Sequence, residues 1–563
     1  MKAMKWIFTS IYFLVVGVSN GQIFNYSSSL GSVDGDAGEA MVTDAQGNLY
    51  VTGYFSQTVD FDPGPGVYNL SADGMEDIFF AKYAPSGALI FARRIGGALP
   101  EAPKSIAVDG FGNIVLTGYI LGPSDFDPAN GGNYIWPTMT GVPNTFLAKY
   151  NNMGSLVCSL LLDNPNHNIV NKVVLYAFVN IYLAVQFRGN MDMDPGPATH
   201  MLVAYSVQDP FIAKYTSAGQ LAWAVNMGSV GYNAALSLAL DLSGGVIATG
   251  YFTGTVDFDP GQGVVNLSSN GSNDIFVVKL HENNGSFIWA KSIGGVSSDR
   301  GMDVKTDGYN NVLLTGTFCN TVDFDPGSGV HNVTVSNTSG FLVKLNHQGD
   351  LVWMRKMDGS DEAYPKAMAL DATGNIYLTG SLYGSIDFSS GAGMGIVNAT
   401  GFDDIFLVKY FSNGNFGFAK GFGGTISDEG NGVAVDNSGG IYFTGSFMGG
   451  VDFSGTATGM PLFSQGASDG FLVKYDQISP LSTNEIHSGF SVGVYPNPAV
   501  DFIRISSGLG SRIRISDIFG RLIYDGITDT EMFNINVSSW AAGQYLVEVS
   551  YEDKTVVKKI LKS

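Results

Sequence analysis

Hydrophobic positions along this chain fall in short runs that are bounded by Gly, Asn and Asp. One representative stretch predicts four strands, at Lys366 to Leu370, Ile376 to Thr379, Ile405 to Tyr410 and around Phe416 and Phe418. The third strand is apolar at nearly every position, which indicates that both of its faces are covered. No helical apolar period of useful length occurs, so the pattern predicts an all-β protein.

The four-strand pattern recurs along the chain. The phrase Asp-Ile-Phe-Leu-Val-Lys-Tyr at 404–410 returns every 65 to 67 residues, with its lysine at Lys82, Lys149, Lys214, Lys279, Lys344, Lys409 and Lys474. A second phrase, Val-Asp-Phe-Asp-Pro-Gly, returns every 64 to 67 residues, with its first aspartate at Asp60, Asp125, Asp192, Asp257, Asp323, Asp387 and Asp452. Two independent phrases therefore agree on seven copies.

Seven units of four strands, each covered by its neighbours, predict a seven-bladed β-propeller. The rival, an open solenoid of hairpins, needs polar capping repeats at its ends. The sequence shows none. A partial unit from Ile23 to Leu30 aligns with the fourth strand of the other copies, whereas no fourth strand follows Phe471 to Tyr475. We therefore expect the N-terminal strand to complete the last blade and close the ring.

The repeated phrases resemble the bacterial β-propeller repeat family often labelled SBBP. The resemblance covers residues 23–478 and carries Gly-Asn-Ile-Tyr-Leu-Thr-Gly at 374–380 together with the two phrases above. The third copy departs from the pattern, because Gln186 and Phe187 stand where Thr-Gly is expected. We expect that blade to be distorted.

The N-terminus has the features of a secretory signal peptide. Lys2 and Lys5 precede an apolar run over residues 6–18, and the small residues Ser19-Asn20-Gly21 follow it. The alternative is a buried N-terminal helix. We predict a signal peptide over residues 1–21, a propeller over 22–478, a linker over 479–489 and a further domain over 490–563. No later segment reaches the roughly 18 uninterrupted apolar residues of a membrane span.

The C-terminal segment contains several more short strands, which predict a small Ig-like β-sandwich. Four motifs follow in order: Tyr495-Pro496-Asn497-Pro498, Asp517 with Gly520 and Arg521, Gly543 with Tyr545, and Lys558-Lys559. Together they resemble the C-terminal (Por-type) sorting domain of type IX secretion. The resemblance implies the type IX machinery as a partner, export through the periplasm to the outer surface, and removal of the domain, with lipopolysaccharide as an anchor. An ordinary adhesive β-sandwich is the alternative.

The net charge of the chain excludes some classes of binding partner. The 563 residues carry 29 Lys and Arg against 50 Asp and Glu, a net charge of -21, and residues 23–489 hold 19 of the basic and 42 of the acidic side chains. Such a surface repels phosphate backbones and anionic membranes, so we expect no nucleic-acid partner. The two cysteines, Cys158 and Cys319, fall in separate copies. We expect them to be buried thiols and not a disulfide.

Paired aspartates are the sharpest polar feature. They are Asp60 and Asp62, Asp125 and Asp127, Asp192 and Asp194, Asp257 and Asp259, and Asp323 and Asp325. Residues i and i+2 of a strand point to the same side, so each pair could offer two oxygen ligands to calcium, the one cofactor we consider. The alternative is that Asp-Pro-Gly forms a turn. In two copies the second aspartate is Ser389 or Ser454, so only the first position is needed for folding.

No catalytic residue can be assigned. The six histidines share no register in the repeats, and no nucleophile elbow or phosphate-binding loop occurs. The recurring lysines lie inside third strands, where we expect them to snorkel at blade edges. Loops after the second and fourth strands should share one rim, including the long segments Pro63–Met75 and Pro326–Ser339. We expect ligands on this rim and at the adjoining mouth of the central channel.

These observations predict an exported protein, secreted or held at the outer cell surface, that acts as a binding or adhesion module for a glycan or protein ligand. The alternative is a secreted hydrolase or lyase that acts on polysaccharide, and a structural surface-layer role is a third option. A fold alone does not separate them. Repeated equivalent pockets would indicate a binder, whereas unlike side chains meeting in the central channel would indicate an enzyme.

Overall fold

The computed structural model describes residues 22–477, apart from 131, 177–179, 206, 360, 392, 456–458 and 460, and residues 493–562, apart from 496–498, 507–508, 518–520, 529, 531, 542 and 552–553. Strands dominate these ranges, where the helical structure is one three-residue 3-10 turn, Pro128–Asn130. The predicted all-β class is confirmed. No helix within the described ranges is long and apolar enough to cross a membrane. The predicted signal peptide and linker lie outside them.

The chain divides into two compact units, one of which is residues 22–477 and the other of which contains the segment from Ile478 to Ser563. In the first unit the strands form antiparallel groups of four. Repeat 1 comprises β2 (Ala37–Thr43), β3 (Leu49–Phe55), β6 (Asp77–Tyr83) and β7 (Leu89–Gly97), hydrogen bonded side by side in that order.

The same order of four strands recurs through the rest of the unit. Repeat 2 comprises β8 (Glu101–Val108), β9 (Ile114–Ile120), β12 (Asn144–Tyr150) and β13 (Leu156–Leu162); repeat 3 comprises β14 (Asn168–Tyr176), β15 (Asn180–Phe187), β18 (Asp209–Tyr215) and β19 (Leu221–Asn226); repeat 4 comprises β20 (Ala234–Leu240), β21 (Gly245–Phe252), β24 (Asp274–His281) and β25 (Phe287–Gly295). Repeat 5 comprises β26 (Arg300–Thr306), β27 (Val312–Phe318), β30 (Ser339–Leu345) and β31 (Leu351–Lys356); repeat 6 comprises β33 (Ala363–Leu370), β34 (Ile376–Asp387), β35 (Ile396–Tyr410) and β36 (Phe416–Phe422). None of the sheets formed by the described residues closes on itself.

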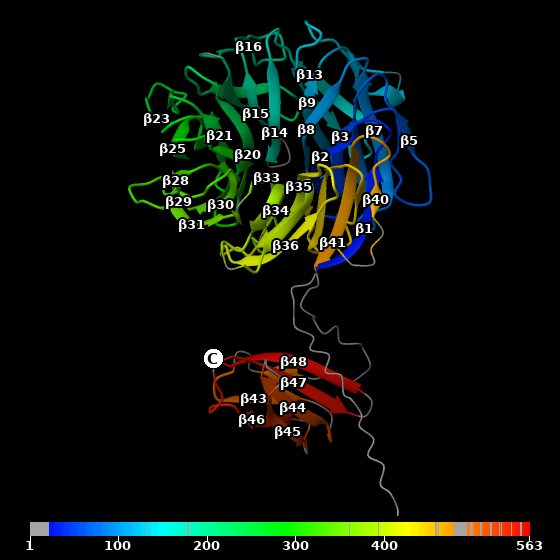
Figure 1. Ribbon diagram of the computed structural model, residues 1–563, viewed down its shortest axis with the longest axis vertical. Helices are drawn as coiled ribbons and strands as arrows, with labels where there is room; N and C mark the ends of the chain where they lie inside the picture. Colours follow the sequence, from blue (N-terminus) through cyan, green and yellow to red (C-terminus); the bar gives the residue numbers. More distant parts are fainter. Residues whose placement is uncertain are drawn as a thin grey trace, which may run out of the picture. The chain divides into compact units, whose positions relative to one another are not determined.

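Repeat 7 is assembled from both ends of the unit. It comprises β37 (Glu429–Val435), β38 (Gly440–Phe447) and β41 (Asp469–Gln477), and its fourth strand is β1 (Gln22–Leu30). The antiparallel pairing runs from Gln22 opposite Gln477 to Leu30 opposite Gly470. The N-terminal strand therefore occupies the place that the sequence predicts for it, and Figure 1 shows β1 beside β41.

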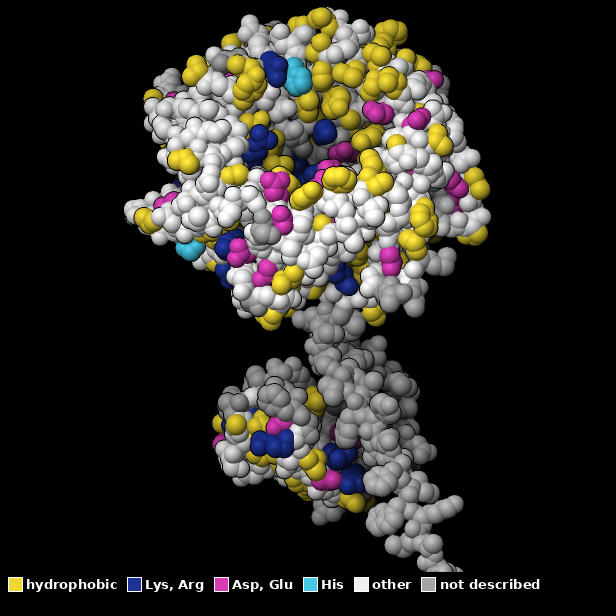
Figure 2. Space-filling view, viewed as in Figure 1, with side chains coloured by type: hydrophobic (Ala, Val, Ile, Leu, Met, Phe, Trp, Pro, Cys, Tyr) yellow, Lys and Arg dark blue, Asp and Glu magenta, His cyan; other side chains and the backbone are white. Residues whose placement is uncertain are grey.

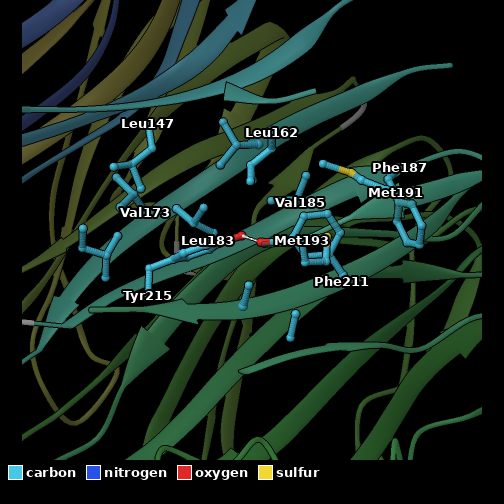
Figure 3. Close-up of a cluster of buried hydrophobic side chains, with 14 of the residues drawn as sticks. Leu147, Leu162, Val173, Leu183, Val185, Phe187, Met191, Met193, Phe211 and Tyr215 are labelled. Carbon is cyan, nitrogen blue, oxygen red and sulfur yellow. Dashed lines mark hydrogen bonds between the residues drawn. The ribbon is translucent and has the colours of Figure 1, made fainter. Parts of the chain in front are cut away.

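The repeats are arranged around a common centre (Figure 1). The first strand of each repeat contacts the first strand of the next, and β37 of repeat 7 contacts β2 of repeat 1. Hydrophobic clusters fill the spaces between successive sheets. In one of them Leu147 and Leu162 of repeat 2 pack against Val173, Leu183 and Phe211 of repeat 3 (Figure 3). Third strands are therefore buried on both faces, as their continuous apolar runs predict.

A short two-stranded ribbon follows the second strand of each repeat, where the sequence predicts an irregular loop. The ribbons are β4 (Thr58–Asp60) with β5 (Asn69–Ser71), β10 (Ser124–Asp125) with β11 (Tyr134–Ile135), β16 (Asn190–Asp192) with β17 (Met201–Val203), β22 (Thr255–Asp257) with β23 (Asn266–Ser268), β28 (Thr321–Asp323) with β29 (Asn332–Thr334), and β39 (Gly450–Val451) with β40 (Leu462–Phe463). In repeat 6 the ribbon continues directly from β34 and β35 and pairs with β32 (Asp358–Gly359).

Two finer expectations differ from the structure. The strands of repeat 3 pair as in the other repeats, and Gln186 and Phe187 continue β15 opposite Pro210 and Asp209, so its pairing is not distorted. Cys158 and Cys319 are free, as expected, but they are half-buried instead of buried.

The C-terminal unit contains two sheets around one core. The first sheet has the order β42 (Gly493–Tyr495), β43 (Phe502–Ser506), β46 (Met532–Asn536), and the second has β45 (Leu522–Ile527), β44 (Arg512–Asp517), β47 (Gly543–Tyr551), β48 (Lys554–Lys562). Ile503, Ile513 and Val547 are among the side chains that share the core. No strand was expected at the position of β46.

Candidate functional site

The first strand of every repeat carries a β-bulge at one residue, where its register against the second strand shifts. A bulge leaves one residue unpaired and re-aims the side chains around it. The seven bulge residues all line one cavity: Glu39, Lys104, Asn171, Leu236, Met302, Lys366 and Asn431. The repeats therefore place unlike side chains at equivalent positions around it.

This central cavity has a volume of about 830 Å³ and is lined by the first strands of all seven repeats. Figure 2 shows basic and acidic side chains gathered around the hollow at the centre of residues 22–477. The charged lining residues are Glu39, Lys104, Lys172, Asp303, Lys305, Lys366 and Glu429. Four lysines thus face three carboxylates, although the chain as a whole has a net charge of -21.

Two glutamates of repeats 7 and 1 form the Glu39/Glu429 cluster. Lys366 Nζ lies 2.7 Å from Glu429 Oε2 and donates to Asn431 Oδ1 at 3.0 Å. Lys104 Nζ lies 3.9 Å from Glu39 Oε2. Burial raises the pKa of Glu39, while Lys104 and Lys366 oppose the shift. Glu39 is therefore biased toward its protonated form, next to a carboxylate that is held in an ion pair.

The Lys172/Asp303/Lys305 cluster lies further along the first strands, after the bulge residues of repeats 3 and 5. Lys305 Nζ lies 3.0 Å from Asp303 Oδ1, and Lys172 Nζ lies 3.6 Å from the same oxygen. Burial alone would raise the pKa of Asp303, but the two lysines lower it to about 2. Burial lowers the pKa of Lys305 to about 8; Lys172 acts in the same direction and Asp303 opposes it. The cluster carries more positive than negative charge.

The paired aspartates lie on the ribbons and do not line this cavity. In repeat 4 Asp257 Oδ1 accepts hydrogen bonds from the backbone N–H groups of Asp259 at 3.1 Å and Val265 at 2.8 Å. Asp259 Oδ1 accepts from the N–H of Gly261 at 2.8 Å. The same backbone bonds to the first aspartate occur for Asp60, Asp125, Asp192 and Asp323. These contacts match the turn alternative, in which the first aspartate closes the end of the ribbon.

The second aspartates have a lesser part in the turn. Asp62, Asp194 and Asp325 each accept one hydrogen bond from a glycine N–H, and Asp127 accepts from the side chain of Asn130. No group of three or more His, Cys, Asp or Glu side chains suited to a metal ion occurs in the described part of the chain. Calcium binding stays a prediction.

The recurring lysines of the third strands are buried or half-buried, and their ammonium groups contact oxygen atoms of their own repeat, as Lys279 does, or of another repeat, as Lys214 and Lys474 do. Lys279 Nζ lies 2.5 Å from Asp241 Oδ2. Lys214 donates to the backbone oxygen of Glu282 in repeat 4 at 2.9 Å, and Lys474 donates to that of Pro85 in repeat 1 at 2.8 Å. The expected snorkelling is therefore wrong, because each ammonium finds oxygen partners in a neighbouring turn.

Buried carboxyl pairs join successive repeats, a feature that the sequence analysis did not assign. The pairs are Asp36 with Asp469, Asp77 with Glu101, Asp274 with Asp299, and Asp404 with Asp428. Each couples the start of a third strand to a residue at, or directly before, the start of the next first strand. A Cβ on Gly294 would lie 2.2 Å from Asp274 Cγ, so the recurring glycine after the fourth strand gives the carboxyl group its space.

The Asp274/Asp299 pair shows the arrangement. Asp299 accepts backbone hydrogen bonds from Gly295 at 2.8 Å and Cys319 at 3.0 Å. Asp274 Oδ1 is buried and has no hydrogen-bond partner among the described residues. In repeat 3 the equivalent partner is Asn233, whose amide donates to Asp209 Oδ1 at 3.0 Å. Where both members are acids, we expect a shared proton to supply the missing donor.

We expect these pairs to make the protein less stable at pH 8 than at pH 5. Burial, reinforced by the neighbouring carboxyl group, raises the pKa of Asp36 and Asp428 to about 6 and that of Glu101 to about 8. The folded state then holds protons that the unfolded chain releases above about pH 4. Stability from these groups is complete below pH 4 and is lost as pH rises through 6 to 8. Denaturant unfolding of the full chain at pH 5 and at pH 8 measures this difference in the free energy of unfolding.

The variant Asp299→Asn tests this expectation, because it places at position 299 the residue type that Asn233 already provides at the equivalent position. The new amide should donate to Asp274 Oδ1, raise the unfolding free energy at pH 8 by about 1 kcal/mol and flatten the pH dependence. Asp350→Asn, at an exposed carboxylate, serves as the control. An unchanged slope in Asp299→Asn would contradict the shared proton.

Exposed valines recur on one rim, which we call the loop rim. Val67, Val264 and Val330 occupy equivalent ribbon tips, and loops that lead from one repeat to the next carry further exposed valines, among them Val230 and Val296. The two loop sets touch, since a Cβ on Gly271 would lie 2.3 Å from the backbone oxygen of Val296. The loop rim therefore presents repeated apolar side chains at the outer edge of the sheets, where ribbon strands such as β28 pair with a fourth strand.

The residues of the sorting motifs are distributed over both sheets of the C-terminal unit. Tyr545 is buried, and its hydroxyl donates to the backbone oxygen of Ala541 at 2.8 Å. Asp517 ends β44 and accepts a hydrogen bond from the backbone N–H of Arg521 at 2.9 Å. Gly543 begins β47, Lys558 and Lys559 lie in β48, and Tyr495 ends β42. Pro496, Asn497, Pro498 and Gly520 lie outside the described residues.

Residues 493–563 match the family described as the secretion system C-terminal sorting domain. This identifies the C-terminal segment as a type IX sorting domain and indicates export to the cell surface or the extracellular space. The chain is also 22% identical, over 82% of its length, to the uncharacterized WD repeat-containing protein L264 of Acanthamoeba polyphaga mimivirus. It spans 39% of the length of that relative.

Two solved structures are similar at a lower level. The extracellular domain of BT3049 from B. thetaiotaomicron has a TM-score of 0.28 and 10% identity, with 93% of this chain and 72% of that one covered. PorZ, a surface component of the type IX secretion system of Porphyromonas gingivalis, has a TM-score of 0.15 and 12% identity, with 95% and 100% covered. Both are extracellular β-rich proteins, and at these scores neither decides the function.

Proposed function

We propose that residues 22–477 form a seven-bladed β-propeller that acts outside the cell as a binding or adhesion module. The cyclic contact order of the first strands and the pairing of β1 with β41 support the propeller. A WD repeat-containing relative fits it too, because WD repeats build four-stranded propeller blades. The SBBP resemblance is part of the same proposal.

The observation that carries the binding proposal is the set of unlike polar side chains in the central cavity. The bulge position is Glu39, Lys104, Asn171, Lys366 or Asn431 in five repeats but Leu236 or Met302 in the other two. A fold that accepts any of these side chains does not require the charged ones. Cavities of several hundred Å³ with a few convergent polar groups are typical ligand sites.

A glycan or a protein is the ligand class that the surface supports. The exposed valines of the loop rim add apolar contacts at the outer edge of the sheets, and loops on a rigid scaffold commonly carry recognition. The sorting domain would deliver the module through the type IX machinery, and lipopolysaccharide would anchor it where it is retained.

A polysaccharide hydrolase or lyase is the second candidate, and the Glu39/Glu429 cluster favours it. Glycoside cleavage commonly uses two carboxyl groups whose environments push their pKa values apart. Burial raises the pKa of Glu39, while Glu429 lies in an ion pair with Lys366 at 2.7 Å. Unlike residues from different repeats meeting in this way are what an enzyme would need.

The experiment is a glycan and protein array probed with the full chain from Gln22 and with Glu39→Gln, Glu429→Gln and the control Asp350→Asn. Loss of at least about tenfold in binding by a cavity variant, with the ligand left intact, supports the binding module. Release of shorter saccharides by the wild type but not by Glu39→Gln supports the enzyme. Binding that no cavity variant weakens would contradict a ligand site in the central cavity.

A further inference from the structure

Three charged side chains of the central cavity stand just after the bulge, at positions where most repeats hold uncharged residues. Lys172 and Asp303 directly follow the bulge residue of repeats 3 and 5, and Lys305 stands two positions further along repeat 5. The counterparts of Lys172 and Asp303 in the other repeats are Ala40, Ser105, Ser237, Ala367 and Gly432, and those of Lys305 are Val42, Ala107, Val174, Ala239, Ala369 and Ala434.

The repeats themselves show that folding does not require these charges. Five of the seven repeats form the same bulged strand with a small uncharged side chain at the position of Lys172 and Asp303. Enclosing charges in the cavity wall costs desolvation free energy that such residues avoid. A Lys-Asp-Lys set confined to two repeats is therefore an addition to the scaffold.

Both carboxylate oxygens of Asp303 accept hydrogen bonds, and Asp303 positions the two lysines. Its carboxylate accepts hydrogen bonds from the hydroxyl of Ser237 in repeat 4 at 2.5 Å, from the N–H of Met368 in repeat 6 at 2.9 Å, and from Lys305 at 3.0 and 3.1 Å. A carboxylate tied to three successive repeats has little freedom to move. It holds the Lys305 ammonium at the cavity wall.

The ammonium groups of Lys305 and Lys172 differ in how many of their N–H donors remain available to a ligand. Lys305 directs its donors to both oxygens of Asp303 and to the backbone oxygen of Val304 at 3.3 Å. Lys172 makes an ion pair with Asp303 at 3.6 Å, and its side chain also lies within hydrogen-bond range of the Lys305 side chain. Its side chain is 29% exposed, within the lining of the cavity. An ammonium has three N–H donors, so Lys172 keeps at least one for a ligand in the cavity.

We infer that Lys172, with Lys305 beside it, binds the anionic group of a small ligand, a carboxylate or a phosphate. Two ammonium groups against one carboxylate leave one positive charge without a counterion, and ammonium–oxyanion hydrogen bonds are among the stronger polar contacts. The cavity of about 830 Å³ leaves room for the remainder of a ligand next to the aliphatic wall formed by residues such as Val174 and Ala239. This inference rests on the proposed function, whose ligand site it specifies.

The test measures binding of sodium phosphate, sodium acetate and sodium glucuronate to the full chain by calorimetry, with sodium chloride at equal ionic strength and glucose as controls. We expect at least one anion to bind the wild type and to bind Lys172→Met at least about tenfold more weakly. Phosphate binding without acetate or glucuronate binding identifies a phosphate group, and the reverse identifies a carboxylate. Lys172→Arg, which keeps the charge, should stay within a few-fold of the wild type.

Lys291→Met is the matched control, because Lys291 lies on an outer strand and pairs with Asp350 outside the cavity. It should bind the anions as the wild type does. Failure of all three anions to bind, or equal binding by Lys172→Met, would overturn the inference. Anion binding that needs Lys172, together with array binding that no cavity variant affects, would keep the anion site and contradict only the proposed function.

Discussion

Removal of residues 493–563 is expected to abolish delivery to the cell surface while residues 22–477 stay folded. The C-terminal segment has its own core, built from side chains such as Ile503, Ile513 and Val547, and it falls in a separate compact unit. It is also the segment that matches the sorting-domain family. Surface labelling of intact cells should fall to background, and the truncated protein should accumulate within the cell envelope.

A point variant distinguishes loss of the sorting function from the effect of shortening the chain. Tyr545→Ala removes a buried ring that packs on Trp540, with a centroid distance of 4.8 Å, and should unfold the small domain or weaken it by roughly 3 to 5 kcal/mol. Arg512→Ala, at an exposed pair with Asp525, is the control and should be delivered normally. Normal surface display of the truncated chain would contradict the sorting function.

The strand framework could be predicted because each third strand is covered on both faces. Runs such as Ile405 to Val408 leave no position for a solvent-facing polar residue, so the pattern shows their burial directly. The ribbons and β46 were missed for the opposite reason. Strands of two to five residues with mostly exposed or half-buried side chains, such as Asn266–Ser268, carry no alternation long enough to detect.

A central channel was expected from the propeller, but the charged residues that line the cavity were not predictable from motif spacing. These charged residues lie at or near a one-residue bulge, and a bulge changes which side chains face inward without a distinct residue type to mark it. A signal was nevertheless present. Aligned copies show Lys172, Asp303 and Lys305 at positions where other copies hold Ala, Ser, Gly or Val.

The carboxyl pairs also left a trace in the sequence. Asp404 opens the phrase that defines the repeat, and it recurs as Asp77, Asp209, Asp274 and Asp469. Its partner lies in a loop of different sequence in each copy, so the pairing needed the fold to become visible. The aspartates of Asp-x-Asp attracted attention because of their spacing, but their observed contacts are with their own turns.

Deletion of residues 22–30 is expected to prevent the first unit from folding stably. Without β1, the strand β41 becomes an exposed edge and Leu30 leaves the cluster that it shares with Leu472 and Leu49. Ser29 no longer donates to Asp469. One buried leucine contributes about 1.5–3 kcal/mol and a whole domain is stable by only about 5–15 kcal/mol, so loss of the strand should leave mainly aggregated protein.

A circular permutant is the matched control for that deletion. Moving residues 22–30 to follow Gln477 through a short turn restores the same strand next to β41, in the way that β7 follows β6 in repeat 1. The permutant should be soluble and should unfold at a temperature near that of the wild type. Equal stability of the deletion and the wild type would show that β1 does not complete repeat 7.

A crystal structure of the secreted protein tests the central claim most directly. The account predicts seven four-stranded sheets around one polar cavity, with β1 paired to β41 and β2 packed against β37. An open stack with a gap between β37 and β2, or a ring with six or eight sheets, would contradict it.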